Sequence, residues 1–280
     1  MLSYRHGFHA ANHADILKHM ILCLLLRALN RKEKPYSIID THSGSGIYNL
    51  SSAMALKNQE FRSGIKRVIN NKGLKKIVPE FFEVLEQLRA ADEQAYPGSP
   101  YFSASLMRDC DKLTLIDLHP TEFENLRRTF RRDERINIQN RDGLEALGAI
   151  LPPMPRRGMC FIDPAYEEKN DYHALVKALK VGLSRWSTGI YAVWYPVLGK
   201  LKDHSKNLVS DIKRLNVPLI QAELRVNEQE EVYGMCGSGM LILNYPYGLD
   251  KELSALISEL YKCLCDEKGE AKLKILVPQP

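Results

Sequence analysis

The sequence predicts an α/β fold in which a doubly wound, mostly parallel sheet of seven strands carries helices on both faces. The main observation is that short apolar runs alternate with longer stretches of helical periodicity along most of the chain. The second is one long gap between the first two apolar runs, which indicates an inserted segment. Composition agrees with a folded domain, since 45% of the 280 residues are hydrophobic and 26% are charged.

The expected strands are short apolar runs bounded by turn residues. They cover residues 36–39, 112–117, 136–139, 158–163, 189–194, 219–226 and 240–244. The expected helices cover residues 14–30, 121–132, 171–185, 198–215 and 249–264. The first helix follows Asn12, a favoured N-cap residue, and repeats apolar side chains with a helical period. Strands that alternate with helices in this way imply a largely parallel sheet.

More than seventy residues separate the first and second expected strands, whereas a βαβ unit takes ~30 residues. We therefore expect a main domain formed by residues 1–51 and 106–280, and a helical subdomain of residues 52–105 inserted above the carboxyl ends of the strands. Residues 57–76 carry seven basic residues and one acidic residue. This excess fits either a solvated helical face or a flap that binds nucleic acid.

Charge and cysteine content narrow the class of protein. The net charge of +5 favours a polyanionic partner without requiring one. The six cysteines form no Cys-x-x-Cys pair, which fits reduced thiols in a cytoplasmic protein and gives no zinc-binding pattern. The amino terminus does not resemble a signal peptide, and no apolar run reaches the ~20 residues of a membrane helix. We expect a cytoplasmic protein without a membrane anchor or a metal.

Small and acidic residues follow three of the expected strands where those strands end. The first strand runs into the loop 40–46, which contains Gly44; the second ends at Asp117; Asp142 and Gly143 follow the third. The loop lacks the full glycine pattern of dinucleotide sites and the Gly-Lys-Ser/Thr of a P-loop. Asp117 could accept hydrogen bonds from ribose hydroxyls, and Asp142 from an adenine amine. Each alone also fits a helix cap or a turn, but together they predict a site for S-adenosylmethionine.

The fourth strand runs directly into Asp163-Pro164-Ala165-Tyr166. An aromatic exocyclic amine is a poor nucleophile, because its lone pair is delocalised into the ring. Two acceptors against its N–H bonds, the Asp163 carboxylate and the Pro164 carbonyl, would direct that lone pair toward a sulfonium methyl group. Tyr166 would stack on a base turned out of its helix or loop. A simple turn also explains Asp-Pro, and the preceding cofactor pattern favours the catalytic interpretation.

The tetrapeptide resembles the Asp-Pro-Pro-Tyr motif of amino-methyltransferases that act on adenine N6, with Ala165 in place of the second proline. The whole chain is similar to the RlmJ family of bacterial 23S ribosomal RNA adenine-N6 methyltransferases. The similarity lies in residues 1–19, 40–42, 96–100, 118–120, 142–143, 156–158 and 189–196. It implies a class I, Rossmann-like methyltransferase fold with an inserted helical subdomain. It also implies that the substrate is 23S ribosomal RNA that carries little protein.

The resemblance implies roles for individual residues. The resemblance implies that the methyl donor contacts His19, His42, Ser99, Asp117, Asp142 and Gly143. We expect Lys18 and Gly44 to contact the donor as well. The expected catalytic group is Asp163, Pro164, Tyr166 and Tyr4, with Asp163 as the acceptor. The expected substrate contacts are Arg5, His6, Lys18 and Tyr166. The family has glutamate where this chain has Asp117, which is one methylene shorter and could still reach a ribose.

Two alternatives stay open from the sequence. The tetrapeptide does not distinguish RNA from DNA, so a DNA adenine-N6 methyltransferase also fits. Ala165 leaves room for a protein that binds nucleic acid and the donor with little turnover, which would suit the use of external DNA associated with relatives of this family. We expect a monomer rather than an obligate oligomer.

Overall fold

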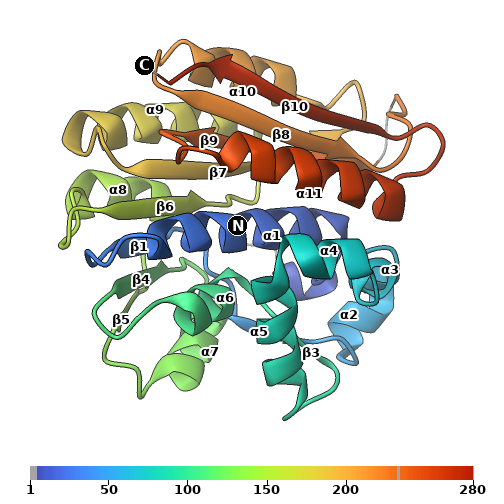
Figure 1. The fold of residues 1–280 in the computed structure, drawn as a ribbon, viewed down its shortest axis with the longest axis horizontal. Helices are drawn as coiled ribbons and strands as arrows, with labels where there is room; N and C mark the ends of the chain where they lie inside the picture. Colours follow the sequence, from blue (N-terminus) through green and yellow to red (C-terminus); the bar gives the residue numbers. More distant parts are fainter. Residues whose placement is uncertain (1–4, 232–233, 280) are drawn as a thin grey trace.

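Eight strands form one sheet in the computed structural model, which describes residues 5–231 and 234–279 (Figure 1). Their order is β10-β8-β9-β7-β6-β1-β4-β5. Their bounds are β1 Ser37–Asp40, β4 Lys112–Ile116, β5 Ile136–Gln139, β6 Gly158–Ile162, β7 Ile190–Leu198, β8 Leu219–Arg225, β9 Met235–Leu243 and β10 Glu270–Val277. The five strands from β7 to β5 pair in parallel, and β9 is antiparallel to both of its neighbours. The predicted mostly parallel sheet is confirmed.

The predicted count of seven strands is wrong. The additional strand is β10, which pairs antiparallel with β8 at the edge of the sheet. Its side chains are exposed or half-buried, and it mixes lysines with apolar residues, as is usual for an edge strand. It therefore lacks the continuous apolar run that identifies a buried parallel strand. A separate two-stranded ribbon, formed by β2 (Ile47–Asn49) and β3 (Ala95–Pro97), was also not predicted.

Helices pack on both faces of the sheet. The core of one face includes side chains of α1 (His13–Asn30), α6 (Ser99–Leu106), α7 (Pro120–Phe130) and α11 (Leu249–Leu264). The core of the other includes α8 (Gly143–Ile150), α9 (Lys169–Arg185) and α10 (Ser205–Lys213). Adjacent strand residues alternate between the cores, as Met159 and Cys160 do on β6. The helix expected at 198–215 is shorter than predicted, because β7 extends to Leu198 and a loop at 199–204 precedes α10.

The long connection between β1 and β4 is mainly helical, as predicted. Before α6 it contains α2 (Ala53–Asn58), the 3₁₀ helix η2 (Glu60–Arg62), α3 (Ile65–Val68), α4 (Lys72–Ile77) and α5 (Pro79–Arg89). In Figure 1, α2, α3 and α4 lie together beside the end of α1, and α3 and α4 pack against α11. Phe61, Ile65 and Leu74 join the same apolar core as α1. The division into two domains stays a prediction.

The amino-terminal end of α1 has a side-chain cap. Asn12 Oδ1 accepts a hydrogen bond from the Asp15 backbone N–H at 2.9 Å, which confirms the predicted N-cap. A 3₁₀ helix, η1 (His6–Phe8), precedes α1 and packs against α2. Among the described residues, no helix is both long enough and apolar enough to span a membrane.

Candidate active site

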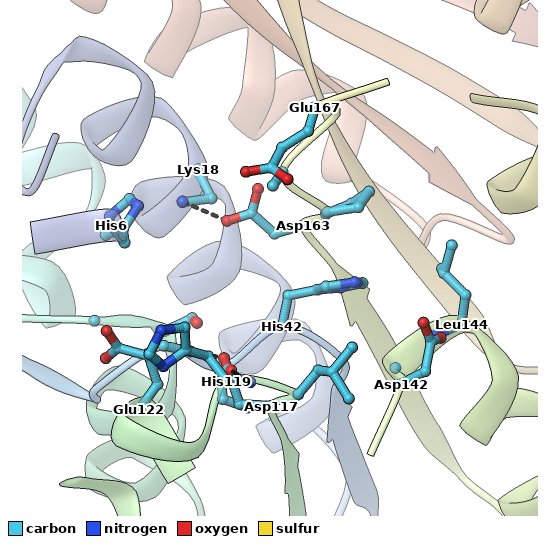
Figure 2. A pocket seen from close by; sticks show the side chains of 18 of the residues that line it. His6, Lys18, His42, Asp117, His119, Glu122, Asp142, Leu144, Asp163 and Glu167 are labelled. Carbon is cyan, nitrogen blue, oxygen red and sulfur yellow. Dashed lines mark hydrogen bonds and ion pairs between the residues drawn. The ribbon is translucent and has the colours of Figure 1, made fainter. Parts of the chain in front are cut away.

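The loops that follow β1, β4, β5 and β6 meet at one edge of the sheet, because these strands are parallel. A pocket lies at this edge (Figure 2). The structure places all the predicted donor contacts around it, namely Lys18, His19, His42, Gly44, Ser99, Asp117, Asp142 and Gly143. Asp163 and Pro164 line the same pocket. The residues that the sequence assigned to the donor are therefore neighbours in space.

Two glycines allow close backbone approach beside this pocket. Gly44 has a left-handed φ of +59°, and a β-carbon there would lie 2.1 Å from the Tyr48 hydroxyl oxygen. A β-carbon on Gly143 would lie 2.0 Å from the Thr41 carbonyl oxygen. Any larger residue would push the loops after β1 and β5 away from their neighbours.

Asp117 connects the loops after β1 and β4. Its Oδ2 accepts a hydrogen bond from the Gly44 backbone N–H at 2.8 Å, and its Oδ1 accepts one from the His119 N–H at 2.8 Å. Burial raises the pKa of this carboxyl group. The interpretation of Asp117 as the cap of α7 is wrong, because His119 holds that position and accepts from Thr121. The Asp117 oxygens still have lone pairs for a ligand.

Asp142 is both a pocket residue and a helix cap. Its Oδ1 accepts hydrogen bonds from the backbone N–H groups of Leu144 at 2.8 Å and Glu145 at 2.9 Å, at the start of α8. Asp142 is therefore the N-cap of α8 rather than part of a plain Asp-Gly turn, and this role does not exclude a ligand. A carboxylate has two oxygens, and the cap uses only Oδ1.

Burial keeps two histidines of the pocket neutral. It lowers the pKa of His19 to about 3, and it also lowers the pKa of His42. His19 Nδ1 lies 2.9 Å from the Tyr96 hydroxyl, and His42 Nδ1 lies 2.8 Å from the Thr41 hydroxyl. Near neutral pH both rings therefore act as uncharged hydrogen-bonding groups.

Ser99 opens α6 and holds a buried carboxyl group. Its hydroxyl donates a hydrogen bond to Asp40 Oδ2 at 2.6 Å. Burial raises the pKa of Asp40 to about 7. The other oxygen, Oδ1, has no hydrogen-bond partner among the described residues. Ser99 thus joins the end of β1 to the pocket.

The charge around the pocket is mainly negative. Its carboxylate side chains are Asp117, Glu122, Asp142, Asp163, Glu167 and Asp171. Lys18 is the only lysine or arginine among the described residues that line it. A phosphate-bearing ligand would be repelled by such a lining, whereas a cationic ligand would be attracted.

Asp163 lies at the end of β6 and interacts directly with α1. Its Oδ2 accepts a hydrogen bond from Lys18 Nζ at 2.5 Å (Figure 2). The Asp163 side chain is 15% exposed and the Lys18 side chain is 5% exposed. These residues are 145 positions apart, so no local sequence pattern indicates the pair. Lys18 was predicted to contact donor and substrate, and the structure adds this ion pair.

A second pocket shares Asp163 with the first. Asp163, Ala165, Lys18 and His6 line both pockets. The second pocket is also lined by Tyr166, Trp194 and Pro196 near the sheet, and by His13, Glu60, Ser63 and Arg67 from α1 and the inserted segment. The aspartate that follows β6 is therefore positioned to contact the contents of both pockets.

Tyr166 forms part of the wall of the second pocket. It has a left-handed φ of +51°, and its ring centroid lies 4.5 Å from that of Tyr172. Its hydroxyl donates a hydrogen bond to the Trp194 carbonyl at 2.6 Å, and the residue is only 8% exposed. The predicted stacking on a base stays a prediction, and it would use the small part of this ring that faces the pocket.

Of the other predicted substrate contacts, His6 lines the two pockets and Arg5 does not. His6 lines both pockets, and its Nε2 lies 2.9 Å from Asp15 Oδ2. Arg5 lines neither pocket; its Nε lies 4.0 Å from Glu122 Oε1. Tyr4 lies outside the described residues.

Several pocket residues were missed by the sequence analysis. They are Ser43, Tyr48, Gly98, Leu118, His119, Glu122, Leu144, Glu167 and Asp171. Most directly follow or neighbour a predicted site residue, so the strand-end pattern could have included them. Tyr48 is on the unpredicted strand β2. Within residues 5–231 and 234–279, no group of three or more histidine, cysteine, aspartate or glutamate side chains could hold a metal ion.

A mostly parallel sheet with two antiparallel strands, β9 and β10, and an acidic pocket at the strand ends are the arrangement of a class I methyltransferase. The family model described as "Ribosomal RNA large subunit methyltransferase D, RlmJ" matches residues 33–277, and the chain belongs to this family. The resemblance noted in the sequence is thus confirmed.

Individual relatives extend this similarity along the whole chain. The Ribosomal RNA large subunit methyltransferase J of Escherichia coli (strain K12) is 38% identical over 282 residues, which is 100% of both chains. The protein of the same name from Haemophilus influenzae is 37% identical over 270 residues, or 95% of both chains. A crystal structure of a Legionella pneumophila str. Philadelphia 1 protein has a TM-score of 0.86 and 34% identity, and covers 95% of this chain and 98% of its own.

Proposed function

We propose that the protein transfers a methyl group from S-adenosylmethionine to the N6 amine of an adenine in 23S ribosomal RNA. The observation that carries this proposal is the position of Asp163 between two adjoining pockets, one of which is strongly acidic. The names of the relatives support large-subunit ribosomal RNA as the substrate.

The acidic pocket suits S-adenosylmethionine, which carries a sulfonium cation and no phosphate. Asp117 would accept hydrogen bonds from the ribose hydroxyls, and Asp142 Oδ2 would accept one from the adenine amine. Gly44 and Gly143 let the loops after β1 and β5 pack closely against their neighbours beside this pocket. When bound, the donor supplies an electrophilic methyl group.

Asp163 and Pro164 would prepare the target amine. Lys18 occupies Asp163 Oδ2, so Oδ1 would accept one N6–H bond while the Pro164 carbonyl accepts the other. The nitrogen lone pair would then be free to attack the methyl group that the donor supplies. As the new N–C bond formed, the bond between that methyl group and the donor sulfur would break and leave a neutral thioether. The excess proton on nitrogen passes to the Asp163 carboxylate.

Ala165 leaves this chemistry intact. The second acceptor is the carbonyl of Pro164, which the change from proline to alanine does not remove. Ala165 adds a backbone N–H and loses the rigidity of a second proline ring. We therefore expect the departure from the family motif to affect rate rather than reaction type.

The second pocket would hold the adenine, turned out of the RNA. The inserted segment forms part of its wall through Glu60, Ser63 and Arg67. Exposed cations of the same segment are Lys57, Arg62, Lys66, Lys72 and Lys76. These side chains would contact the phosphates on either side of the adenine, which favours the nucleic-acid-binding interpretation of the segment. We propose that a single copy of the chain is sufficient.

Transfer assays with labelled S-adenosylmethionine test the substrate. We expect methylation of protein-free 23S ribosomal RNA, less methylation of assembled large subunits, and none of duplex DNA. Activity on duplex DNA alone would contradict the proposal in favour of a DNA methyltransferase. Donor binding without transfer to any nucleic acid would instead indicate a binding protein.

A further inference from the structure

Asp15 of α1 is a fully buried carboxylate for which the proposed reaction has so far no use. Its Oδ2 accepts a hydrogen bond from the Ala11 backbone N–H at 2.8 Å and lies 2.9 Å from His6 Nε2. Its Oδ1 lies 2.9 Å from Lys18 Nζ. Its neighbours hold the pKa of Asp15 well below its usual range, despite the opposing effect of burial. A buried charge is costly unless it is paired, and here the pairing leads directly to the active site.

Lys18 lies between two carboxylates. Its ammonium group is 2.9 Å from Asp15 Oδ1 and 2.5 Å from Asp163 Oδ2, and 5.6 Å from the centre of the Trp194 ring. Asp15 and Lys18 are three positions apart on one helix, so they share a face of α1. A long lysine side chain with one partner can adopt several rotamers, whereas two fixed partners select one. Asp15 therefore limits where the Lys18 ammonium can lie.

We propose that Asp15 is a positioning residue for methyl transfer, which acts on the Asp163 carboxylate through Lys18. This role rests on the proposed function. With Lys18 held by Asp15, the carboxylate of Asp163 keeps one oxygen occupied and the other directed to the target amine. A misplacement of a catalytic group by about 1 Å can cost ~10²-fold in rate. Through His6 and Ala11, the same carboxylate also couples the segment before α1 to the catalytic aspartate.

If Asp15 had a purely structural role, its substitution would lower stability and leave kcat unchanged. Asp15 lies in the first turn of α1, where a negative charge stabilises the helix. Asp111 offers a matched comparison, because it is also fully buried and bound by a cation, Arg108, and a backbone N–H, that of Tyr36. It precedes β4 and so lies at the opposite end of the sheet from the pocket. Substitution of Asp111 therefore shows the effect of losing a buried carboxylate that lies away from the active site.

The experiment compares kcat, the KM for 23S ribosomal RNA and the Kd for S-adenosylmethionine among variants. We expect Asp15→Asn to lower kcat at least ~10-fold, a part of the ~10²–10⁴-fold that a positioned proton acceptor contributes, with KM and Kd close to wild type. Asp111→Asn should lower thermal stability with kcat unchanged. A wild-type kcat in folded Asp15→Asn would overturn the proposal.

A double substitution keeps the test decisive if Asp15→Asn folds poorly. The variant Asp15→Asn/Lys18→Met removes both charges together, so that neither buried charge is left without the other as its partner. If Asp15 acts through Lys18, the double variant should have the same kcat as Lys18→Met. A further loss in the double variant would overturn the proposed route. Wild-type protein that transfers nothing would instead contradict the proposed function, and with it this role.

Discussion

At the scale of single residues, Asp163 has the most direct role in the proposed chemistry. Asp163→Asn retains the size of the side chain but removes the negative charge and one acceptor. We expect kcat to fall by ~10²–10⁴-fold, as for the loss of a general base, while the donor Kd stays close to wild type. Single-turnover transfer and donor titration measure the two effects separately. A rate equal to wild type would refute the assigned role.

Asp117 tests the assignment of the donor site. Asp117→Ala removes the expected ribose acceptor, and it also releases the Gly44 and His119 backbone N–H groups. We expect donor binding to weaken by ~1–3 kcal/mol, the scale of a lost hydrogen bond to a charged group. Calorimetric titration gives this value. Asp117→Glu restores a carboxylate and should recover most of the affinity; wild-type affinity in the alanine variant would contradict the ribose assignment.

The sequence predicted which residues gather around the pocket where these residues follow a strand. Asp117, Asp142 and Asp163 each end or follow an apolar run, and parallel strands bring such ends together. Residues positioned by tertiary packing could not be found in this way. The pairing of Lys18 with Asp163 joins α1 to β6, and the burial of the Tyr166 ring depends on contacts with Tyr172 and Trp194. Neither relation leaves a local pattern.

At the scale of elements, α1 joins the core to the active site. The central part of this helix, residues 20–26, is buried on all sides, and its first two turns present Asp15, Lys18 and His19 to the pockets. The helix and its cap were predictable from periodicity and Asn12. The edge strand β10 was not, because its partly polar sequence reflects its position at the sheet edge rather than burial.

His19 predicts how stability depends on pH. Burial lowers its pKa to about 3 in the folded protein, against ~6.5 in an unfolded chain. Between these values the unfolded chain binds a proton that the folded protein does not, so stability is fully present above pH ~6.5 and falls as the pH falls toward 3. In His19→Asn, we expect the slope of unfolding free energy between about pH 4 and 6 to decrease by up to ~1.4 kcal/mol per pH unit. Urea unfolding measures this, and an unchanged slope would contradict a neutral buried His19.

At the scale of the whole molecule, the inserted segment shares the main core and also borders the second pocket. The spacing of strands predicted that an insertion exists and that it is helical. The spacing could not predict that the insertion forms part of the wall of the second pocket, because its position depends on packing against α11 and η1. The proposed donor pocket thus lies at the strand ends, and the proposed substrate pocket is lined by both the sheet and the insertion.

Identification of the methylated nucleoside tests the central claim most directly. Protein-free 23S ribosomal RNA from cells that lack this protein would be treated with S-adenosylmethionine and either wild-type protein or Asp163→Asn, digested, and analysed by mass spectrometry. The predicted result is N6-methyladenosine at a defined adenine with the wild type and almost none with the variant. A methyl group at another position of the base or ribose, or equal product with Asp163→Asn, would contradict it.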